Sequence, residues 1–428
     1  MTESFLHYIW QFQYLSKTAL LTTMGQEISV FHPGQRNPHS GPDFFNARVR
    51  IGEIEWMGSV EIHIHSSGWL EHHHNTDPTY DNVILHVVWK NDKTVTRSDG
   101  SDMPTLELKD RVSESLLIHY NSLMHNPEEI PCGSRLDGIN TISKLSMLDK
   151  VLTERLESKA QLVLKVLQRN NNDWEETAYQ MILKNFGFKV NTEPFQQLAQ
   201  SVSYKFLLRH ADQWLQVEAL LFGQAGFLEE NSADQYYRAL QREYKLLSQK
   251  YQLTGKKVSK TQWRFLRLRP ANFPTLRIAQ FASLIHHRKN FFSSILSEST
   301  NKGLRTFFSV QQSAYWMRHY SFFREQPEDV TILGELSIDN IIINSVVPVL
   351  AAYGKSRDDD MYVDRAVRIL QQMHPESNMI IRHWNSLGLS ARTAFDSQGL
   401  LHLYNNYCLK RRCLDCNIGA SLINPRNT

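Results

Sequence analysis

The sequence of 428 residues has few cysteines, no long apolar run and none of the common nucleotide-binding or serine hydrolase signatures. Four cysteines are too few for a disulfide scaffold, which favours a reducing compartment. No stretch approaches 18 uninterrupted apolar residues. The N-terminus has an early acid, Glu3, and it lacks the basic region and the small-residue cleavage site of a secretory leader. Walker A, GxGxxG and GxSxG patterns are absent, so nucleotide hydrolysis, dinucleotide chemistry and serine hydrolysis have no support. We therefore expect a cytoplasmic protein without membrane association.

The composition is that of an ordinary globular protein. Hydrophobic residues make up 41% of the chain and charged residues 21%, which is enough for a packed core. The formal net charge of +3 indicates no class of partner by itself. The length favours two or three domains.

One segment departs from this charge balance. Residues 238–289 contain 13 Lys or Arg and a single acid, Glu243, with aromatic residues among them. Basic side chains neutralise phosphates, and aromatic rings stack on bases, so the pattern favours a nucleic-acid partner. A solvated helical face is the alternative. The side chains predicted to bind nucleic acid are Lys256, Lys257, Lys260, Arg264, Arg267 and Arg269.

The first part of the chain predicts a small α/β domain. Apolar spacing over residues 4–17 predicts a helix, and the Gly and Pro residues between 25 and 42 predict loops. Residues 45–51 and 54–64 predict a hairpin. The apolar run 83–89 is typical of a central strand that is buried on both faces.

From about residue 140 onward the pattern becomes helical. Apolar residues recur every three or four positions from Ile142 to Leu156, and Asp173 with Glu176 predicts the start of a helix that Gly187 ends. Another helix is expected to start at residues 192–194, and residues 264–269 predict a packed helix. The expected fold class is α+β, with a domain over 1–135 that contains a small mixed sheet and a mostly helical region over 136–428.

The carboxylates of the first domain suggest metal-assisted chemistry. Asp43 enters a predicted strand after a Gly-Pro bend, and Glu61, His63 and His65 share one face of the next strand because side chains alternate. Two carboxylates on adjacent strands suit Mg²⁺ or Mn²⁺. A nearby imidazole can orient or deprotonate an attacking water. The pattern predicts phosphodiester hydrolysis, with Asp43 and Glu61 as ligands and His63 as the third catalytic residue.

Six of the 18 histidines lie between residues 63 and 86. This density leaves open a Zn²⁺ or Mn²⁺ site, because imidazole is a common transition-metal ligand. We interpret His73 and His74 as parts of a polar loop. The secondary candidates for the site are His65, His72 and His86.

The four cysteines form a second candidate metal site. Cys408, Cys413 and Cys416 have the spacing C-x4-C-x2-C, and Cys132 is the remaining cysteine of the chain. Four thiolates suit tetrahedral Zn²⁺ or an iron–sulfur cluster. The alternative is a group of reduced thiols at a helix end, where neighbouring Lys and Arg residues lower the thiol pKa.

Residues 1–92 resemble the PD-(D/E)XK nuclease superfamily. The resemblance rests on Pro42-Asp43 at a strand start, followed 18 residues later by Glu61-x-His63 on the next strand. It implies a core helix, strands that carry the metal-binding acids Asp43 and Glu61, a crossover helix and a further strand. His63 occupies the position of the usual lysine, and the acid often found on the first helix has no clear match.

Most of the chain also resembles an uncharacterised bacterial family that is known only as a domain of unknown function. The segments that carry this resemblance are SGPDF, GSVEIHIHSSGW, YDNVILHVV, RLRPANFPTLRIAQ and YCLKRRCLDCNIG. It implies no activity.

Three functions follow from these patterns. The first is a metal-dependent nuclease that uses Asp43, Glu61 and His63. The second is a non-catalytic nucleic-acid-binding or assembly protein on a decayed nuclease scaffold. The third is a histidine-rich transition-metal hydrolase that acts on a small substrate.

Overall fold

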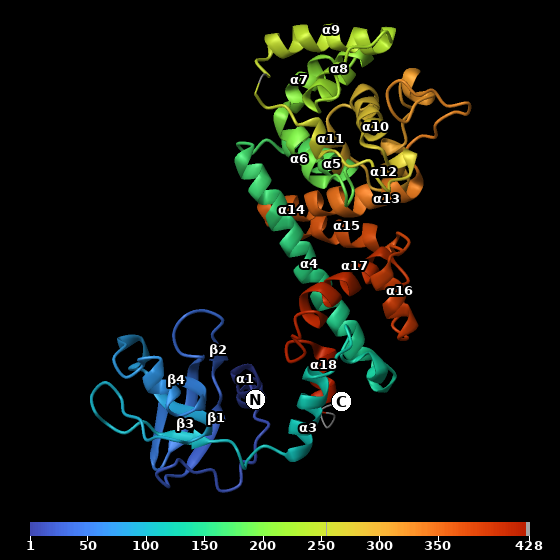
Figure 1. Cartoon of the computed structure of the whole chain (residues 1–428). Helices are drawn as coiled ribbons and strands as arrows, with labels where there is room; N and C mark the ends of the chain where they lie inside the picture. Colours follow the sequence, from blue (N-terminus) through green and yellow to red (C-terminus); the bar gives the residue numbers. More distant parts are fainter. Residues whose placement is uncertain (254, 425–428) are drawn as a thin grey trace. The chain divides into compact units, whose positions relative to one another are not determined.

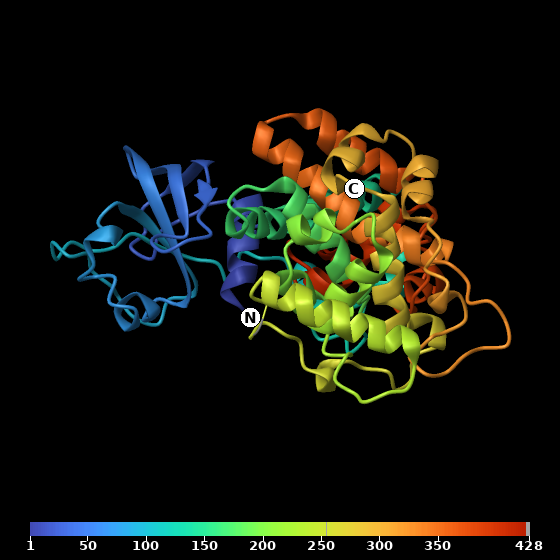
Figure 2. The same ribbon diagram turned by 90° about the horizontal axis from the view of Figure 1, so that it is seen from above.

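The chain folds into two compact units. The computed structural model describes residues 1–253 and 255–424. The first unit comprises Met1–Met147 and the chain from Leu403 onward, and the second comprises Leu148–His402 (Figures 1 and 2). The sequence analysis assigned everything after residue 135 to one helical region, whereas the described residues from 403 onward cluster with the first unit.

The first unit is built on a mixed six-stranded sheet in the order β1-β3-β4-β5-β6, with β2 also pairing with β3 (Figure 1). The pairs β1/β3 and β3/β4 are antiparallel, and β4/β5 and β5/β6 are parallel. The strands are β1 (Ile28–His32), β2 (Gln35–Arg36), β3 (Phe44–Ile51), β4 (Ile54–His65), β5 (Val83–Lys90) and β6 (Thr105–Glu107).

The predicted hairpin and central strand are confirmed. Gly52, with a φ of +61°, makes the tight turn between β3 and β4 that a residue with a Cβ adopts only with strain. In β5, the residues from Val83 to Val88 are all buried, as a near-continuous apolar run predicts. The loop prediction for residues 25–42 is wrong where β1 and β2 lie, because these short strands at the margin of the sheet lack a strong apolar alternation.

Parallel pairing of β4 with β5 requires a crossover connection between them. The crossover contains α2 (Gly68–Glu71) and a 3₁₀ turn over Pro78–Tyr80. Trp69 anchors it: the side chain is 1% exposed, clusters with Val83 and Met103, and donates a hydrogen bond from Nε1 to the carbonyl of Thr96 at 3.0 Å.

Helix α1 (Glu3–Phe12) packs beside β4 in the first unit (Figure 1). Thr2 caps its N-terminus, and the helix ends earlier than predicted because Gln13 adopts a left-handed conformation. The remaining helices of the unit are α3 (Glu114–Met124) and α18 (Asn417–Ile423), with a 3₁₀ turn over Gly133–Gly138 and a π turn over Tyr404–Cys408.

The second unit is helical, as the sequence predicts. Asp173 accepts a hydrogen bond from the amide of Glu176, and Gly187 ends the helix that follows. The helices are α4 (Thr141–Arg169), α5 (Trp174–Phe186), α6 (Thr192–Ser201), α7 (Tyr204–Arg209), α8 (Trp214–Gln224), α9 (Gln235–Lys250), α10 (Pro274–His287), α11 (Phe291–Ser297), α12 (Asn301–Phe308), α13 (Glu335–Ile341), α14 (Val347–Arg357), α15 (Asp360–Gln371), α16 (Met379–Ser386) and α17 (Ala394–Leu403).

The helix predicted over residues 264–269 is wrong. This segment is a loop between two 3₁₀ turns, Lys260–Gln262 and Pro270–Asn272. Arg267 has a φ of +62°, and Pro270 disfavours the helical conformation of the residue before it. The apolar residues of the segment therefore do not follow one helical face.

One helical stretch, Glu335–Arg357, is long and apolar enough to cross a membrane by length and composition. It combines α13, a π turn over Ile342–Val346 and α14. Within the fold, 67% of its most apolar window is buried, which is the situation of a core helix.

The second unit buries one acidic side chain, Glu218, in a hydrogen-bond network. Glu218 on α8 is 1% exposed and accepts hydrogen bonds from Ser313 Oγ at 2.6 Å and Tyr236 Oη at 2.8 Å. Trp316 Nε1 donates in turn to the Tyr236 hydroxyl at 2.8 Å. Burial raises the pKa of Glu218 to about 7, although both hydrogen bonds act in the opposite direction.

Glu218→Gln should remove a pH dependence of folding. The folded-state pKa lies above that of the unfolded chain, so the protonated carboxyl stabilises the fold at low pH, and this contribution is lost as pH rises through about 7. Urea unfolding should show the free energy of unfolding of the wild type falling by about 3 kcal/mol, relative to Glu218→Gln, between pH 4.5 and 8. Exposed Glu335→Gln is the control and should follow the wild type. Parallel curves for Glu218→Gln and the wild type would contradict the assignment.

Candidate metal centre

Two carboxylates join the first residues of β3 to the middle of β4. The amide of Asp43 donates to Glu61 Oε2 at 3.0 Å, and the amide of Ile62 donates to Asp43 Oδ2 at 3.0 Å. Each carboxylate therefore accepts a backbone hydrogen bond from the strand that carries the other. This reciprocal pairing brings Asp43 and Glu61 together, as the sequence predicts, and leaves their other oxygens for further contacts.

His63 lies at the centre of a cluster of imidazole rings. Its Nδ1 is 2.9 Å from His86 Nε2, and its Nε2 is 3.1 Å from His72 Nδ1. Glu61 and His86 are register partners on the parallel strands β4 and β5, so both side chains point to the same face as His63. When His63 Nδ1 donates to His86 Nε2, the lone pair of His63 Nε2 is directed toward His72.

The crossover brings His72 and His74 over that face. Gly68 allows the close approach, since a Cβ there would lie 2.9 Å from the His63 ring. Asp92 holds the beginning of the crossover by accepting hydrogen bonds from the amide and the hydroxyl of Ser67. The hydrogen bond from the Ser67 amide is the main cause that lowers the pKa of Asp92, to about 2.

His74 lies in a turn, as the loop interpretation predicts, but its side chain is buried against the cluster. His74 is 8% exposed, its ring stacks on Tyr80 at 3.7 Å between centroids, and its Nε2 lies 3.3 Å from Glu61 Oε1. Its Nδ1 has no hydrogen-bond partner among the described residues, and its Nε2 is near only the Glu61 carboxylate. A buried imidazole nitrogen without a partner is costly unless a metal or water satisfies it. His73 is exposed, as predicted for a loop.

These side chains have the spacing of a metal coordination shell. Ligand atoms of His63, His72 and His74 all lie within 4.8 Å of one another, and Glu61 Oε1 is 3.8 Å from His63 Nε2. A tetrahedral ion with bonds of about 2.1 Å holds neighbouring ligands about 3.4 Å apart. Three of the separations among these atoms, 3.1, 3.3 and 3.8 Å, are close to that value. Three imidazoles and one carboxylate are a ligand set for a transition metal.

Burial determines the charge of the centre. It lowers the pKa of His63 to about 2 and that of His86 to about 3, with repulsion from neighbouring histidines acting in the same direction. Burial also raises the pKa of Glu61, and the negative charge of Asp43 adds to this effect, while His74 opposes it. His63 and His86 are therefore neutral at neutral pH, and the neutral imidazole is the form that binds metal ions.

The sequence analysis missed His7, which α1 contributes. Its Nε2 lies 3.1 Å from Asp43 Oδ2, and its ring packs against Phe44. The side chain of Asp43 is 24% exposed and His72 is exposed, so the centre opens to solvent on the side of these two residues. The one available signal was a polar residue between buried positions of an otherwise apolar helix.

His65 does not join the cluster. His65 alternates onto the same face of β4 as Glu61 and His63, but it is exposed at the end of the strand, where it pairs with Lys90. The crossover begins immediately after His65 and covers only the preceding part of the face.

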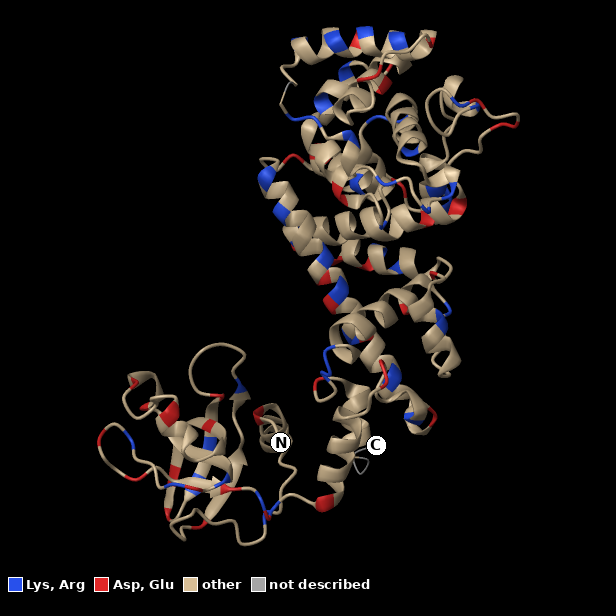
Figure 3. Cartoon of the chain, in the orientation of Figure 1, with Lys and Arg blue, Asp and Glu red and all other residues tan. Residues whose placement is uncertain are grey.

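The predicted nucleic-acid-binding side chains lie on the surface of the second unit. All six are exposed, and Lys257 and Lys260 form ion pairs with Glu229 and Glu230, just before the basic segment 238–289. Basic residues also mark the outer side of α9, as Figure 3 shows. Exposed ion pairs contribute little stability, so these lysines remain available to an anionic partner.

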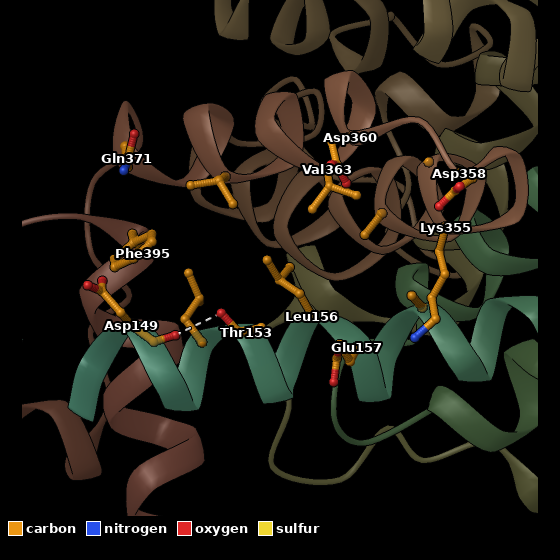
Figure 4. Close-up of a pocket in the computed structure, with 15 residues that line it drawn as sticks. Asp149, Thr153, Leu156, Glu157, Lys355, Asp358, Asp360, Val363, Gln371 and Phe395 are labelled. Atoms are coloured by element: carbon orange, nitrogen blue, oxygen red, sulfur yellow. Dashed lines mark hydrogen bonds between the residues drawn. The ribbon is translucent and has the colours of Figure 1, made fainter. Parts of the chain in front are cut away.

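A separate cleft of about 530 Å³ lies within the second unit between α4, α14, α15 and α17 (Figure 4). Leu156 and Val363 contribute apolar surface, and Asp149, Glu157 and Asp358 line it with carboxylates. None of the residues predicted from the sequence to form a site lines this cleft.

Removing a ligand should weaken metal binding. Mn²⁺ is the probe, because thiolates prefer softer metals and the cysteines then do not interfere. Electron paramagnetic resonance of free Mn²⁺ should show that Glu61→Gln and His72→Ala each lose more than about 100-fold in affinity, since even outer-shell partners contribute about 10–100-fold. His65→Ala is the matched control on β4 and should bind like the wild type. Unchanged affinity in both ligand variants would contradict the assignment.

Comparison with known proteins assigns the chain to a family. A family model described as a protein of unknown function, DUF2851, matches residues 3–379. No curated protein and no solved structure matches the chain. The matched range includes all residues of the candidate metal centre and the whole basic segment, and it ends before Cys408. The chain belongs to the DUF2851 family of proteins of unknown function.

Proposed function

We propose that this protein is a metal-dependent hydrolase that cleaves phosphodiester bonds in nucleic acid. The observation that carries the proposal is the convergence of the His63, His72 and His74 nitrogens with Glu61, next to the partly exposed carboxylate of Asp43. A metal bound there polarises a phosphoryl oxygen and acidifies a water molecule. The remaining steps depend on residues of the chain itself.

The order of the elements supports the phosphodiesterase assignment. A helix, α1, precedes antiparallel strands, the parallel strand β5 follows the crossover, and Asp43, just before β3, lies beside Glu61 on β4. The resemblance to PD-(D/E)XK nucleases implies a similar element order, with a longer crossover helix than the four residues of α2. Here α1 contributes His7 near Asp43, where that family often has an acid.

The ligand set favours Mn²⁺ or Zn²⁺ over Mg²⁺. Mg²⁺ prefers oxygen ligands and retains several waters, whereas imidazole suits transition metals. With both nitrogens of His63 facing other histidines, His63 fits the role of a ligand better than that of a free base. His86 Nε2 contacts Nδ1 of His63, the ring nitrogen that does not face His72. It would orient the His63 ring, as hydrogen-bond partners of ligand histidines do in metal sites.

Asp43 and His7 are placed to accept the proton of the attacking water and to transfer it to solvent. Asp43 Oδ2 is fixed by the Ile62 amide and lies 3.1 Å from His7 Nε2, at the side of the centre that opens to solvent. A carboxylate paired with an imidazole can accept a proton and pass it on. In this assignment Glu61 holds the metal and Asp43 acts mainly on the water.

The basic segment supports nucleic acid as the substrate. Eleven of its 13 lysines and arginines are exposed. Arg288 is partly buried, and Arg277 is buried and hydrogen-bonded to Asn272, Gln280 and Ser337, which removes it from the binding surface. A phosphate-rich polymer matches the remaining positive charge. A small substrate would not need this surface.

Substitutions of Asp43 and Glu61 should have different effects on metal binding and on turnover. Purified protein is assayed on single- and double-stranded DNA and RNA with Mg²⁺, Mn²⁺ and Zn²⁺. Asp43→Asn should lose activity by about 100-fold or more while keeping its Mn²⁺ affinity, because a positioned base contributes about 10²–10⁴-fold. Glu61→Gln should lose both. Exposed Glu53→Gln, in the turn of the same hairpin, is the control.

Full activity in both carboxylate variants would reject the site. Nucleic-acid binding by the wild type without cleavage under any metal would favour the non-catalytic scaffold. Cleavage of small phosphodiesters alone, without salt-sensitive polymer binding, would favour the small-substrate hydrolase.

Replacing Lys256, Lys257 and Lys260 with Gln should weaken nucleic-acid binding and its salt dependence. Each lost phosphate contact on duplex DNA lowers the slope of log affinity against log salt by about 0.9. Fluorescence anisotropy across several salt concentrations measures this slope, and circular dichroism checks the fold. A variant with Lys165, Lys302 and Lys355 replaced by Gln loses the same charge outside the basic segment and is the control. Equal slopes for the two variants would remove the segment from the binding surface.

A further inference from the structure

All four cysteines of the chain belong to the first unit and are buried. Cys132, Cys408, Cys413 and Cys416 are each between 6% and 8% exposed, and none forms a disulfide. Buried cysteines often act as small apolar residues, but such residues distribute over a core. Here the complete cysteine complement comes from two segments more than 270 residues apart in sequence.

Hydrogen bonds tie the two segments together. Arg411 Nη1 donates to the carbonyl of Glu128 at 2.7 Å, and the hydroxyl of Tyr404 donates to Glu129 Oε2 at 2.8 Å. Glu128 and Glu129 lie just before Cys132, which precedes the 3₁₀ turn Gly133–Gly138. The segment that carries Cys132 is thereby fixed against the segment that carries Cys408.

The other three cysteines lie in the segment 408–416, which we call the knuckle. The amide of Arg411, which has a φ of +52°, donates to the carbonyl of Cys408 at 3.1 Å, and the amide of Cys416 donates to that of Cys413 at 3.4 Å. Gly419 on α18 permits this packing, because a Cβ there would lie 2.3 Å from the carbonyl oxygen of Cys413. The three cysteines of the knuckle are therefore buried within nine consecutive residues.

Burial and the neighbouring charges act together on the pKa values of these thiols. Burial raises the pKa of Cys132 to about 12, and the charges of Cys416 and Cys413 raise it further. Cys408 is affected in the same direction, first by burial and then by Cys132, Cys416 and Cys413. Arg135 and Arg411 act in the opposite direction on these thiols, and their positive charges would balance a group of thiolates.

We propose that Cys132, Cys408, Cys413 and Cys416 form a second metal centre, separate from the histidine centre, in which four thiolates bind zinc or an iron–sulfur cluster. Soft thiolate ligands select these metals, and four cysteines complete the coordination of either. The centre would attach the chain after residue 403 to the segment around Cys132. Metal binding then contributes directly to folding of the first unit.

Metal analysis of the full-length protein tests the proposal. Protein purified without oxygen should contain about one zinc ion per chain at this site, or iron with acid-labile sulfide and visible absorption. Cys132→Ser and Cys413→Ser should each remove this metal, whereas Asp415→Asn, in the same knuckle, should retain it. Iron with sulfide identifies the cluster, and colourless protein with zinc identifies the mononuclear site.

A separate measurement covers variants that fail to fold. In wild-type protein the bound thiols should resist alkylation until a chelator is added, and after chelation limited proteolysis should cleave within residues 403–424 faster. His72→Ala should leave this protection unchanged, so failure of the histidine centre is distinguishable from failure of the cysteine centre. Wild-type protein with four freely alkylated thiols, and with neither zinc nor iron after reconstitution, would overturn the proposal.

Discussion

The parallel pairing of β4 with β5 is the constraint on which the rest of the first unit depends. Parallel neighbours cannot be joined by a tight turn, so the chain must cross over one face of the sheet. The register places Glu61 beside His86, and the crossover that follows carries His72 and His74 across the same face. The strand pairing therefore generates both halves of the candidate metal centre.

The cost of this arrangement is the burial of polar groups. The Nδ1 atoms of His74 and His86 have no hydrogen-bond partners among the described residues. Such groups destabilise a fold unless something else satisfies them, and a metal ion does so for several imidazoles at once. Desolvation lowers the pKa of His63, so its imidazole stays unprotonated and its nitrogen lone pair is available to a metal ion. The same physics applies to the buried thiols around Cys132, whose burial disfavours the thiolate until a metal binds it.

The sequence was most informative where local patterns coincide with tertiary ones. Strands β3, β4 and β5, the approach of Asp43 to Glu61 and the place of His63 beside them all follow from alternation and apolar runs. His7 and His74 could not be predicted, because their roles depend on how α1 and the crossover pack. Residues 264–269 were mistaken for a helix because their apolar positions look periodic, while Arg267 and Pro270 bend the backbone. The division into an N-terminal part and a helical part was predicted, but the clustering of the described residues from 403 onward with the first unit was not, since contacts between segments far apart in sequence carry no local signal.

The central claim is that the histidines of β4 and the crossover hold a metal ion with Glu61. The most direct measurement is X-ray diffraction from crystals of the protein grown with Mn²⁺, with anomalous differences recorded at a wavelength where manganese scatters strongly. The account predicts an anomalous peak about 2.1–2.2 Å from the ligand atoms of His63, His72, His74 and Glu61, with His86 contacting His63 behind them. Ordered side chains at full Mn²⁺ concentration with no anomalous peak among them, or a peak bound only by surface carboxylates elsewhere, would contradict it.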